Sequence, residues 1–367
     1  MKIVHVTQFL GIGGLEKIIY HIIPEQMAAG HEVSLYVYDY DQEWVPFFRS
    51  SGINVLTPPI KKPGFDLAVM WRMHNDLFSA DVIHTHDLNP LIYLFPLFFW
   101  RKTFFMKHPK LIHTTHGLSH LEKVPRYKTF ERFIIPFTDA VVGVSEKIIR
   151  FYKDELDISF QKIKLIENGV SLYKSPITAE LRLEKKLWLC KRHQLDPARP
   201  ILLSLSRVLP LKDQLFLIQA VKLKPNYQLL IVGPPSDQAY FEELKIFEDA
   251  NIILTGAQDL VSDYNLGSDL YVSASTHEGI PVAVLEAMAV ETPCVVSDIP
   301  GHRTLDQFGR CLEFFDLNNK EMFLAECEKL LNDKELAYNN SKLGKRIVEE
   351  HFSVKTMVEK YLGVYKS

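Results

Sequence analysis

Two carboxylates, Glu278 and Glu286, stand on either side of a Gly-Ile-Pro turn and the start of an apolar helical pattern. Pro281 suits the first position of that helix because it has no N–H group to lose, so Glu278 is expected in the loop just ahead of the helix. The free N–H groups of a helix N-terminus favour an anion. Glu286 lies among Val, Leu, Ala and Met, where a carboxylate is costly to bury without a partner. The arrangement indicates a site for a ligand that is anionic and rich in hydroxyl groups, such as a nucleotide sugar.

Two cations, Arg207 and Lys212, follow a predicted strand at 201–206 and precede a helical pattern. A pair of cations in such a loop can clamp a diphosphate, which carries charge on several oxygens. The alternative is that both are ordinary solvated surface residues. Their position in the same predicted domain as Glu278 favours the diphosphate.

A glycine-rich loop, GIGGLE at 11–16, lies between the first predicted strand and the first predicted helix. Glycines there let the backbone approach a ligand closely. A dinucleotide-binding fingerprint would have a third Gly where Glu16 stands. Asp39, at the end of the second strand, is where a ribose-binding acid would lie. An NAD-dependent oxidoreductase therefore stays open as an alternative at this point.

Histidines close two of the predicted strands, in the runs His84-Thr85-His86-Asp87 and His113-Thr114-Thr115-His116. Either run contains residues that bind metals. The three-residue spacing of His113 and His116 suits a helix, however, and this segment has the pattern of a strand running into a loop. Histidines at the end of a strand that hydrogen-bond a polar substrate are the favoured interpretation, and purely structural histidines are the alternative.

The length of 367 residues is enough for two domains with full cores, and a composition of 47% apolar and 24% charged residues is that of a globular protein. The net charge of −3 argues against a general nucleic-acid-binding surface. The four cysteines lack metal-binding spacing, which indicates reduced thiols in a cytoplasmic protein. The first residues show no apolar signal-peptide region.

Short apolar strands alternate with helical patterns in both halves of the chain, which predicts parallel sheets covered on both faces. The fold class expected is α/β, with two Rossmann-like, doubly wound domains that face a cleft. The predicted domains are 1–175, a helix-plus-linker at 176–199, and 200–351, followed by a helix at 352–367. Predicted strands lie at 2–7, 32–38, 82–85, 110–115, 140–144, 163–166, 201–206, 228–232, 251–255, 270–274, 294–297 and 311–315.

Basic and aromatic residues interleave over the stretch 100–133, which contains eight Lys or Arg between Arg101 and Arg132 but only two acids. Such a surface can dock on anionic lipid headgroups. A solvated face over an ordinary core is the alternative. The apolar run 91–100 is too short to span a bilayer, which takes about 20 residues.

The motifs together resemble the retaining glycosyltransferases of family 4, which have the GT-B fold. The most specific part is Ser275, the Glu278-Gly279-Ile280-Pro281 run, Glu286 to Ala289, and Thr292 to Val296. Supporting matches are Gly13-Gly14-x-Glu16, Asn168-Gly169-Val170, Ser206-Arg207 with Lys212, Val232-Gly233 and Asp269 to Val272.

The resemblance implies roles for the donor-binding residues. Arg207 and Lys212 would neutralise the diphosphate, Glu286 would bind the ribose, and Glu278 would face the transferred sugar. The rest of the implied donor set consists of Gly14, Gly233, Gly279 and the backbone N–H groups near Ile280 and Val282.

The resemblance also implies that the helix at 352–367 returns to the first domain. Further roles follow from the same resemblance. His116 would contact the donor sugar near the reacting carbon, and Glu16 and Asp87 would lie on the acceptor side. The implied reaction moves a hexose-type sugar from a UDP- or GDP-sugar to a hydroxyl of a glycan or lipid-linked acceptor, in surface polysaccharide or glycolipid synthesis. No cofactor and no divalent metal are expected, because the cations do that work. The expected location is cytoplasmic, or peripheral on the inner face of the plasma membrane through 100–133.

Three residues depart from the family pattern: Asp213 and Glu291 stand where the family has Gly, and Thr304 stands where an acid is common. They affect the expected loop geometry and sugar specificity. They also motivate an alternative function, a non-catalytic subunit that binds a sugar nucleotide.

Overall fold

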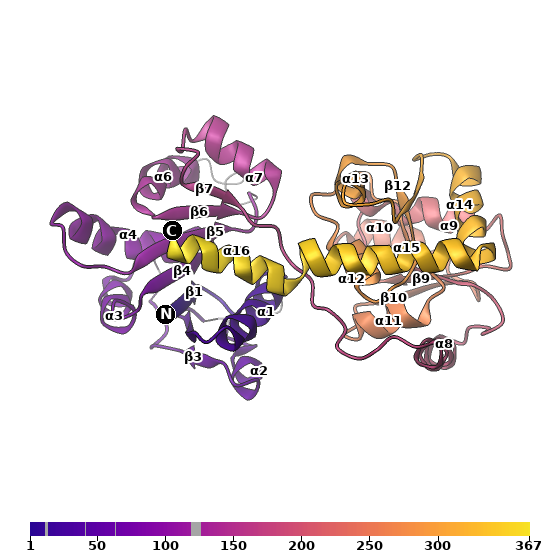
Figure 1. Cartoon of the computed structure of the whole chain (residues 1–367), viewed down its shortest axis with the longest axis horizontal. Helices are drawn as coiled ribbons and strands as arrows, with labels where there is room; N and C mark the ends of the chain where they lie inside the picture. The colour runs from indigo at the N-terminus through magenta and orange to yellow at the C-terminus, as the bar shows by residue number, and fades with distance from the viewer. Residues whose placement is uncertain (12–13, 41, 63, 119–125) are drawn as a thin grey trace. The chain divides into compact units, whose positions relative to one another are not determined.

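The computed structural model of the chain describes residues 1–11, 14–40, 42–62, 64–118 and 126–367. These residues form two compact units (Figure 1). Unit 1 consists of Met1–Gly169 and Val354–Ser367, and unit 2 consists of Val170–Ser353. Each unit is a parallel α/β sheet layered between helices, which confirms the predicted fold class.

Unit 1 contains a parallel sheet of seven strands in the order β3-β2-β1-β4-β5-β6-β7. The strand order reverses between β1 and β4, and ligands in open α/β sheets bind at the carboxyl ends of strands at such a point. The strands are β1 (Lys2–Thr7), β2 (Glu32–Val37), β3 (Asn54–Leu56), β4 (Val82–His86), β5 (Lys110–Thr115), β6 (Ala140–Gly143) and β7 (Ile163–Leu165).

Helices cover both faces of the unit 1 sheet, because successive residues of each strand point to opposite faces and both sets are apolar. One face packs against α1 (Gly14–Ala28), α2 (Val45–Ser50) and α16 (Val354–Lys366), and α16 lies beside α1 (Figure 1). The other face packs against α3 (Leu67–Leu77), α4 (Leu88–Thr103), α6 (Arg126–Ile134), η1 (Ile135–Phe137), α7 (Glu146–Arg150) and η2 (Phe151–Glu155).

Unit 2 contains a parallel sheet of six strands in the order β10-β9-β8-β11-β12-β13, which reverses between β8 and β11. Its strands are β8 (Ile201–Leu205), β9 (Gln228–Val232), β10 (Ile252–Gly256), β11 (Leu270–Ser273), β12 (Cys294–Ser297) and β13 (Glu313–Phe315). Its helices are α8 (Ala179–His193), η3 (Pro210–Lys212), α9 (Gln214–Val221), α10 (Gln238–Lys245), α11 (Val261–Gly267), α12 (Val282–Ala289), α13 (Pro300–Asp306), α14 (Lys320–Asn332), α15 (Lys334–Ile347) and η4 (Val348–Phe352).

The stretch predicted as a helix plus linker, 176–199, is mostly helix α8, and the structure places this helix in unit 2. Leu189 and Cys190 on α8 are buried in the unit 2 core, and the half-buried Lys185 and Lys186 form ion pairs with Asp263 and Asp269. The helix approaches α11 so closely that a Cβ atom on Gly267 would lie 2.7 Å from the carbonyl oxygen of Lys185. The change of unit instead occurs at Val170, whose N–H donates to the carbonyl oxygen of Phe352 at 2.8 Å.

Among the helices that the structure describes, none combines the length and the apolar character needed to cross a bilayer.

Candidate functional site

The loop between β11 and α12 carries Glu278, the acid singled out from the sequence. Strand β11 is buried and ends at Ser273, and α12 begins at Val282, one residue later than expected. Oε1 of Glu278 accepts a hydrogen bond from Oγ of Ser275 at 2.7 Å and forms an ion pair with Nζ of Lys212. The side chains of Lys212 and Glu278 are only 18% and 15% exposed. The carboxylate is therefore held from two sides while one part of it stays accessible.

A second layer of hydrogen bonds holds the backbone of this loop. Oγ of Ser297, at the end of β12, donates to the carbonyl oxygen of Ser275 at 2.6 Å. Nδ1 of the buried His302 donates to the carbonyl oxygen of Ser297 at 2.8 Å, and burial lowers the pKa of His302. At Gly301 a Cβ atom would lie 2.6 Å from the carbonyl oxygen of Glu278, so glycine is required there.

Sequence reasoning did not single out Ser297 and His302. The available signal was the Gly301-His302 pair directly after a strand, since a glycine at such a position marks a close approach of two backbone segments.

The two predicted cations lie in the loop that follows β8. Lys212 ends the short helix η3, and Arg207 is exposed. The carbonyl oxygen of Arg207 accepts a hydrogen bond from Nε2 of Gln214 at 3.0 Å. Gly233, after β9, has φ +150°, and a Cβ atom there would lie 1.9 Å from the carbonyl oxygen of Ser206. The loops after β8 and β9 are therefore in direct contact.

Glu286 is half-buried on α12, inside unit 2. Burial raises the pKa of Tyr271 well above its usual value, and the charges of Glu278 and Glu286 add to that increase. Both acids therefore lie near the same tyrosine at the end of the sheet. The Val282 N–H, expected to bind the ligand, donates to the carbonyl oxygen of Ile280 at 3.0 Å in this structure. Gly279 lies in the same turn.

In unit 1, a cavity of about 390 Å³ lies at the carboxyl ends of β1, β4 and β5. Its lining includes Glu16, Asp87 and His116, three of the residues expected to contact the substrates. Helix α1 begins at Gly14, and Gly13 lies outside the described residues.

Asp87 has a backbone conformation that is almost restricted to glycine, with φ 65° and ψ 174°. Such a conformation costs about 1–3 kcal/mol and is concentrated at functional sites. The Asp87 N–H donates to the carbonyl oxygen of Thr114 at 3.1 Å, which ties the strained residue to β5. The strain and the position in the cavity both favour a functional role for Asp87.

Three buried histidines of unit 1, His5, His84 and His86, have ring nitrogens within 4.8 Å of one another. That spacing suits a metal ion. Each of their six ring nitrogens already has a hydrogen-bond partner, however, at distances between 2.6 and 3.0 Å. A metal would have to displace these bonds. His113 is likewise bonded to the hydroxyls of Thr85 and Thr115, so it is a structural histidine.

Asp39, the residue behind the oxidoreductase alternative, is 2% exposed. It accepts a hydrogen bond from Nε2 of Gln8 at 2.7 Å and pairs with Lys61 at 3.5 Å. Its carboxylate is thus engaged within unit 1.

Comparison with known proteins accounts for both units. Residues 12–174 match the family model described as Glycosyltransferase Family 4, and residues 190–346 match the model described as Glycosyl transferases group 1. The chain belongs to glycosyltransferase family 4. The resemblance inferred from the motifs is thereby confirmed, and a glycosyltransferase replaces the NAD-dependent oxidoreductase.

Relatives of this glycosyltransferase include a UDP-Gal:alpha-D-GlcNAc-diphosphoundecaprenol alpha-1,3-galactosyltransferase of Escherichia coli. It is 27% identical over 275 residues, which cover 70% of this chain and 69% of that protein. A glycosyltransferase from Rickettsia africae has a similar structure, with a TM-score of 0.79 at 21% identity over 100% of this chain and 97% of that one. Anabaena Alr3699/HepE, solved with UDP and glucose, gives a TM-score of 0.76 at 16% identity, with 100% of both chains covered. The two structures share the GT-B fold with this chain.

Two departures from the family pattern fall at backbone positions that favour glycine. Asp213 has φ 43° and Glu291 has φ 58°. The Asp213 side chain caps α9 by accepting a hydrogen bond from the N–H of Phe216 at 3.3 Å. The third departure, Thr304, is half-buried on α13 and donates to the carbonyl oxygen of Pro300 at 3.0 Å.

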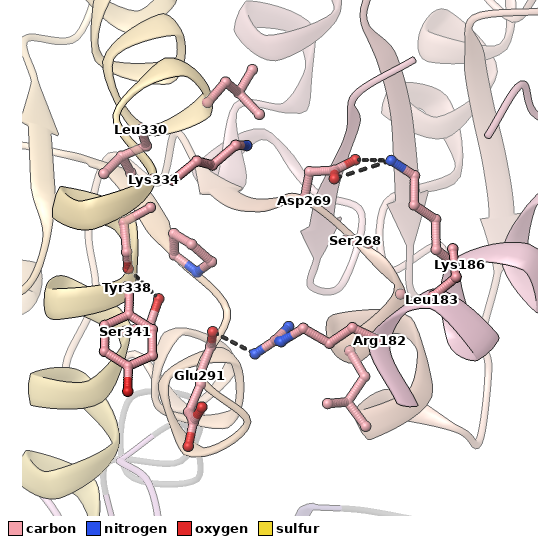
Figure 2. A pocket seen from close by; sticks show the side chains of 15 residues that line it. Arg182, Leu183, Lys186, Ser268, Asp269, Glu291, Leu330, Lys334, Tyr338 and Ser341 are labelled. Carbon is pink, nitrogen blue, oxygen red and sulfur yellow. Dashed lines mark hydrogen bonds and ion pairs between the residues drawn. The ribbon is translucent and has the colours of Figure 1, made fainter. Parts of the chain in front are cut away.

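Glu291 borders a second cavity, which lies in unit 2 and has a volume of about 280 Å³. Figure 2 shows this cavity from close by. Nη2 of Arg182 donates to the carbonyl oxygen of Glu291 at 2.6 Å, and Lys186 pairs with Asp269 at 2.8 Å (Figure 2). The Glu291 carboxylate pairs with Lys342 at 2.8 Å and with Lys345 at 3.1 Å. These bonds join α8, α12 and α15 and offset the unusual backbone conformation of Glu291.

Proposed function

We propose that this glycosyltransferase moves a hexose-type sugar, with retention of configuration, from a UDP-sugar to a hydroxyl of a lipid-linked or glycan acceptor. The observation that carries the proposal is the set of bonds around Glu278, which joins Lys212 and Ser275 at the carboxyl end of the unit 2 sheet. A GDP-sugar is the alternative donor. The names of the E. coli relative and of the Anabaena complex, which both include UDP, favour UDP.

The charges of the site match the charge that develops in the reaction. Breaking the bond between sugar and diphosphate builds positive charge on the sugar and negative charge on the leaving group. Fixed cations at the leaving group are therefore effective catalysts. Lys212 and Arg207 supply these cations, and Glu278 faces the sugar. The Lys212–Glu278 ion pair compensates both charges in the unliganded protein, and a diphosphate offers Lys212 a second anion.

The proposed step is a front-face displacement that needs no divalent metal. The diphosphate leaves from the same face of the sugar that the acceptor hydroxyl attacks, so the departing phosphate oxygen can take the hydroxyl proton. A covalent intermediate on a carboxylate, as in retaining glycosidases, is the competing mechanism. Trapping with a slow fluorinated donor followed by mass spectrometry distinguishes the two, because only the competing mechanism leaves a sugar bonded to the protein.

The acceptor is proposed to carry its sugar on a polyprenyl diphosphate. The E. coli relative is named for such an acceptor, and so is a relative from Campylobacter jejuni that is 29% identical over 203 residues. The unit 1 cavity offers Asp87 and Glu16 as oxygen acceptors for the hydroxyls of that sugar.

A lipid-linked acceptor requires a membrane surface, and the C-terminal end of α4 is suited to one. Phe104, Phe105 and Met106 are 57%, 96% and 44% exposed and follow one another in the chain. Two basic residues of the stretch 100–133 already form ion pairs, Lys102 with Asp139 and Lys128 with Glu155. Lys123 lies outside the described residues. We therefore propose peripheral attachment to the inner face of the plasma membrane in which this apolar tip, Phe104 to Met106, contributes more than charge.

The function is tested by incubating the purified protein with UDP- and GDP-sugars and a membrane extract as the source of acceptor, and measuring release of UDP or GDP. Wild type should turn over at least one donor. Glu278→Ala and Lys212→Ala should abolish turnover, and Glu326→Ala should leave it intact because Glu326 is a carboxylate paired with Lys329 away from the site. Failure of every donor to bind by calorimetry would refute the proposal. Binding without turnover would favour the non-catalytic sugar-nucleotide subunit.

A further inference from the structure

A continuous row of hydrogen bonds runs through the interior of unit 1 and ends at the cavity. It begins at Gln26 on α1, whose Oε1 lies 2.8 Å from Nε2 of His5. Nδ1 of His5 lies 2.9 Å from Nε2 of His86, and Nδ1 of His86 lies 3.0 Å from Nε2 of His116. Gln26, His5 and His86 are completely buried, and His116 lines the cavity.

The row has a direction because a neutral imidazole has one N–H donor and one acceptor nitrogen. The carbonyl oxygen of Gln26 can only accept, so His5 carries its proton on Nε2 and accepts at Nδ1. His86 must then donate from Nε2 and accept at Nδ1, and His116 must donate from Nε2. Nδ1 of His116 is left as a lone pair, and within the residues that the structure describes no hydrogen bond occupies it.

A second branch is compatible with this orientation of the Gln26 amide. Nε2 of Gln26 donates to the hydroxyl of Tyr365 on α16 at 3.2 Å. That hydroxyl then donates to Nδ1 of His84 at 2.6 Å, and Nε2 of His84 donates to the hydroxyl of Thr114 at 2.7 Å. Each bond in the two branches then joins one donor to one acceptor, so the orientation is self-consistent.

The three histidines of the row are neutral near pH 7, so each ring has one donor and one acceptor nitrogen. Burial lowers the pKa of His5 to about 4 and that of His86 well below 6.5. Burial also lowers the pKa of His116, although the nearby Asp87 carboxylate acts in the opposite direction.

We propose that Gln26 is a positioning residue that acts through His5 and His86 to hold His116 in the tautomer whose Nδ1 accepts a hydrogen bond from a substrate hydroxyl. The substrate part of this inference rests on the proposed function. The fixed tautomer selects for a ligand that presents an O–H group to Nδ1 of His116. A carbonyl or ether oxygen has no proton to donate to this nitrogen, which is itself an acceptor.

The tautomers are measured by long-range ¹H–¹⁵N correlation spectra of the full chain labelled with ¹⁵N-histidine, and the His116→Asn variant identifies the His116 signals. In the wild type, His5, His86 and His116 should all carry their protons on Nε2. Gln26→Met removes the acceptor for His5 and should turn His116 into a mixture of tautomers. Gln26→Glu retains an acceptor oxygen and should preserve the wild-type tautomers. A proton on Nδ1 of wild-type His116, directed at Asp87, would overturn the proposal without any variant.

Tyr361→Phe is the matched control, because its buried hydroxyl is bonded to Thr114 at 3.3 Å and touches none of the three histidines of the row. It should change neither tautomers nor turnover. Gln26→Met should lower kcat/KM by roughly 10- to 100-fold, the range for partners that fix the tautomer of a metal-bound histidine. Unchanged tautomers in Gln26→Met would overturn the role of Gln26. Expected tautomers without turnover of any donor by the wild type would overturn the proposed function, and with it the substrate role of His116.

Discussion

The polar residues of both candidate sites are positioned by hydrogen bonds from residues that do not themselves face a ligand. Glu278 accepts from Ser275, whose backbone is held by Ser297, and Ser297 is held in turn by His302. In unit 1 the corresponding support is the row from Gln26 to His116. Support of this kind restricts the rotation of a catalytic side chain, and small displacements of such groups reduce rates strongly.

Ser275→Ala is expected to lower kcat/KM by roughly 10- to 100-fold, because a hydrogen bond to a charged group contributes about 1.5–3 kcal/mol. Without that hydroxyl, the Glu278 carboxylate is held by Lys212 alone. Initial rates of nucleotide release give the measurement. Thr304→Ala, which removes a hydroxyl bonded to the carbonyl oxygen of Pro300, should retain the wild-type rate. Equal rates for the two variants would show that Ser275 does not position Glu278.

At the scale of the elements, two acidic residues at helix ends adopt a backbone conformation with positive φ that favours glycine. Asp213 precedes α9 and Glu291 follows α12, both with positive φ. Each acid gains a bond that a glycine could not form, a helix cap in one case and two lysine pairs in the other. The departures from the family pattern therefore add bonds to two loops at positions whose backbone conformation favours glycine.

Glu291→Ala and Glu291→Gly separate the two effects at this position. Both variants lose the pairs with Lys342 and Lys345, but only alanine keeps a Cβ atom at φ 58°. Alanine should therefore be the less stable of the two by roughly 1 kcal/mol. Urea unfolding of the two variants and the wild type measures the difference. A glycine variant less stable than the alanine variant would contradict this explanation.

The apolar tip after α4 gives a second prediction at this scale. Phe104→Ser combined with Phe105→Ser should release the protein from liposomes rich in anionic lipid, because the variant loses most of its insertable apolar surface. Cosedimentation measures the bound fraction. Phe160→Ser, which alters a phenylalanine that is 72% exposed elsewhere in unit 1, should bind as the wild type does. Loss of binding in all variants, or in none, would count against a specific role of the tip.

The sequence predicts the elements of both units well because buried parallel strands are continuous apolar runs bounded by polar residues. The predictions for β1, β5, β9 and β12 match the observed bounds. Strand β3 was missed because three residues, Asn54–Leu56, are too few to form a pattern. Helix α8 was predicted as part of a helix plus linker between the domains because charged residues dominate its composition, and the structure places it in unit 2.

The candidate sites were only partly accessible to sequence reasoning. Glu278 and Lys212 were linked through the family motifs, and the structure brings them into contact. The histidine row was not predicted, since His5 and His86 come close to each other only through the pairing of β1 with β4. A single chain without the strand order does not indicate which residues face one another across a parallel sheet. The same limit applies to Ser297 and His302.

At the scale of the whole molecule, the two units differ in their buried histidines. Unit 1 holds the buried His5, His84 and His86 and the half-buried His116 in one cluster, all with lowered pKa values. Unit 2 buries His302 alone in its candidate site. The units are therefore expected to respond differently to acid.

Acid should unfold unit 1 before unit 2. The pKa of His5 is about 4 in the folded protein and 6.5 when exposed, so the unfolded chain binds the extra proton between these values. The contribution of His5 to the free energy of unfolding is complete above pH 6.5 and is lost as the pH falls to 4. The loss is about 3 kcal/mol, because each pKa unit between the folded and unfolded states corresponds to about 1.4 kcal/mol. His84 and His86 act in the same direction.

Tryptophan fluorescence separates the two units in this acid titration. Trp44, Trp71 and Trp100 lie in unit 1, and Trp188 lies in unit 2. A Trp188→Phe variant reports on unit 1, and a variant that keeps only Trp188 reports on unit 2. Coincident transitions, or an earlier one in unit 2, would contradict the prediction.

The place of α16 in unit 1 has a consequence for synthesis on the ribosome. Met357, Tyr361 and Tyr365 complete a core that otherwise consists of residues from the first half of the chain. The whole of unit 2 is translated between these two parts, which takes on the order of ten seconds or more at 5–20 residues per second. During that interval the nascent first half exposes an uncovered apolar face, while unit 2 emerges with all of its strands in sequence. Chaperones that bind nascent chains are therefore expected to attend the first half for longer than the second.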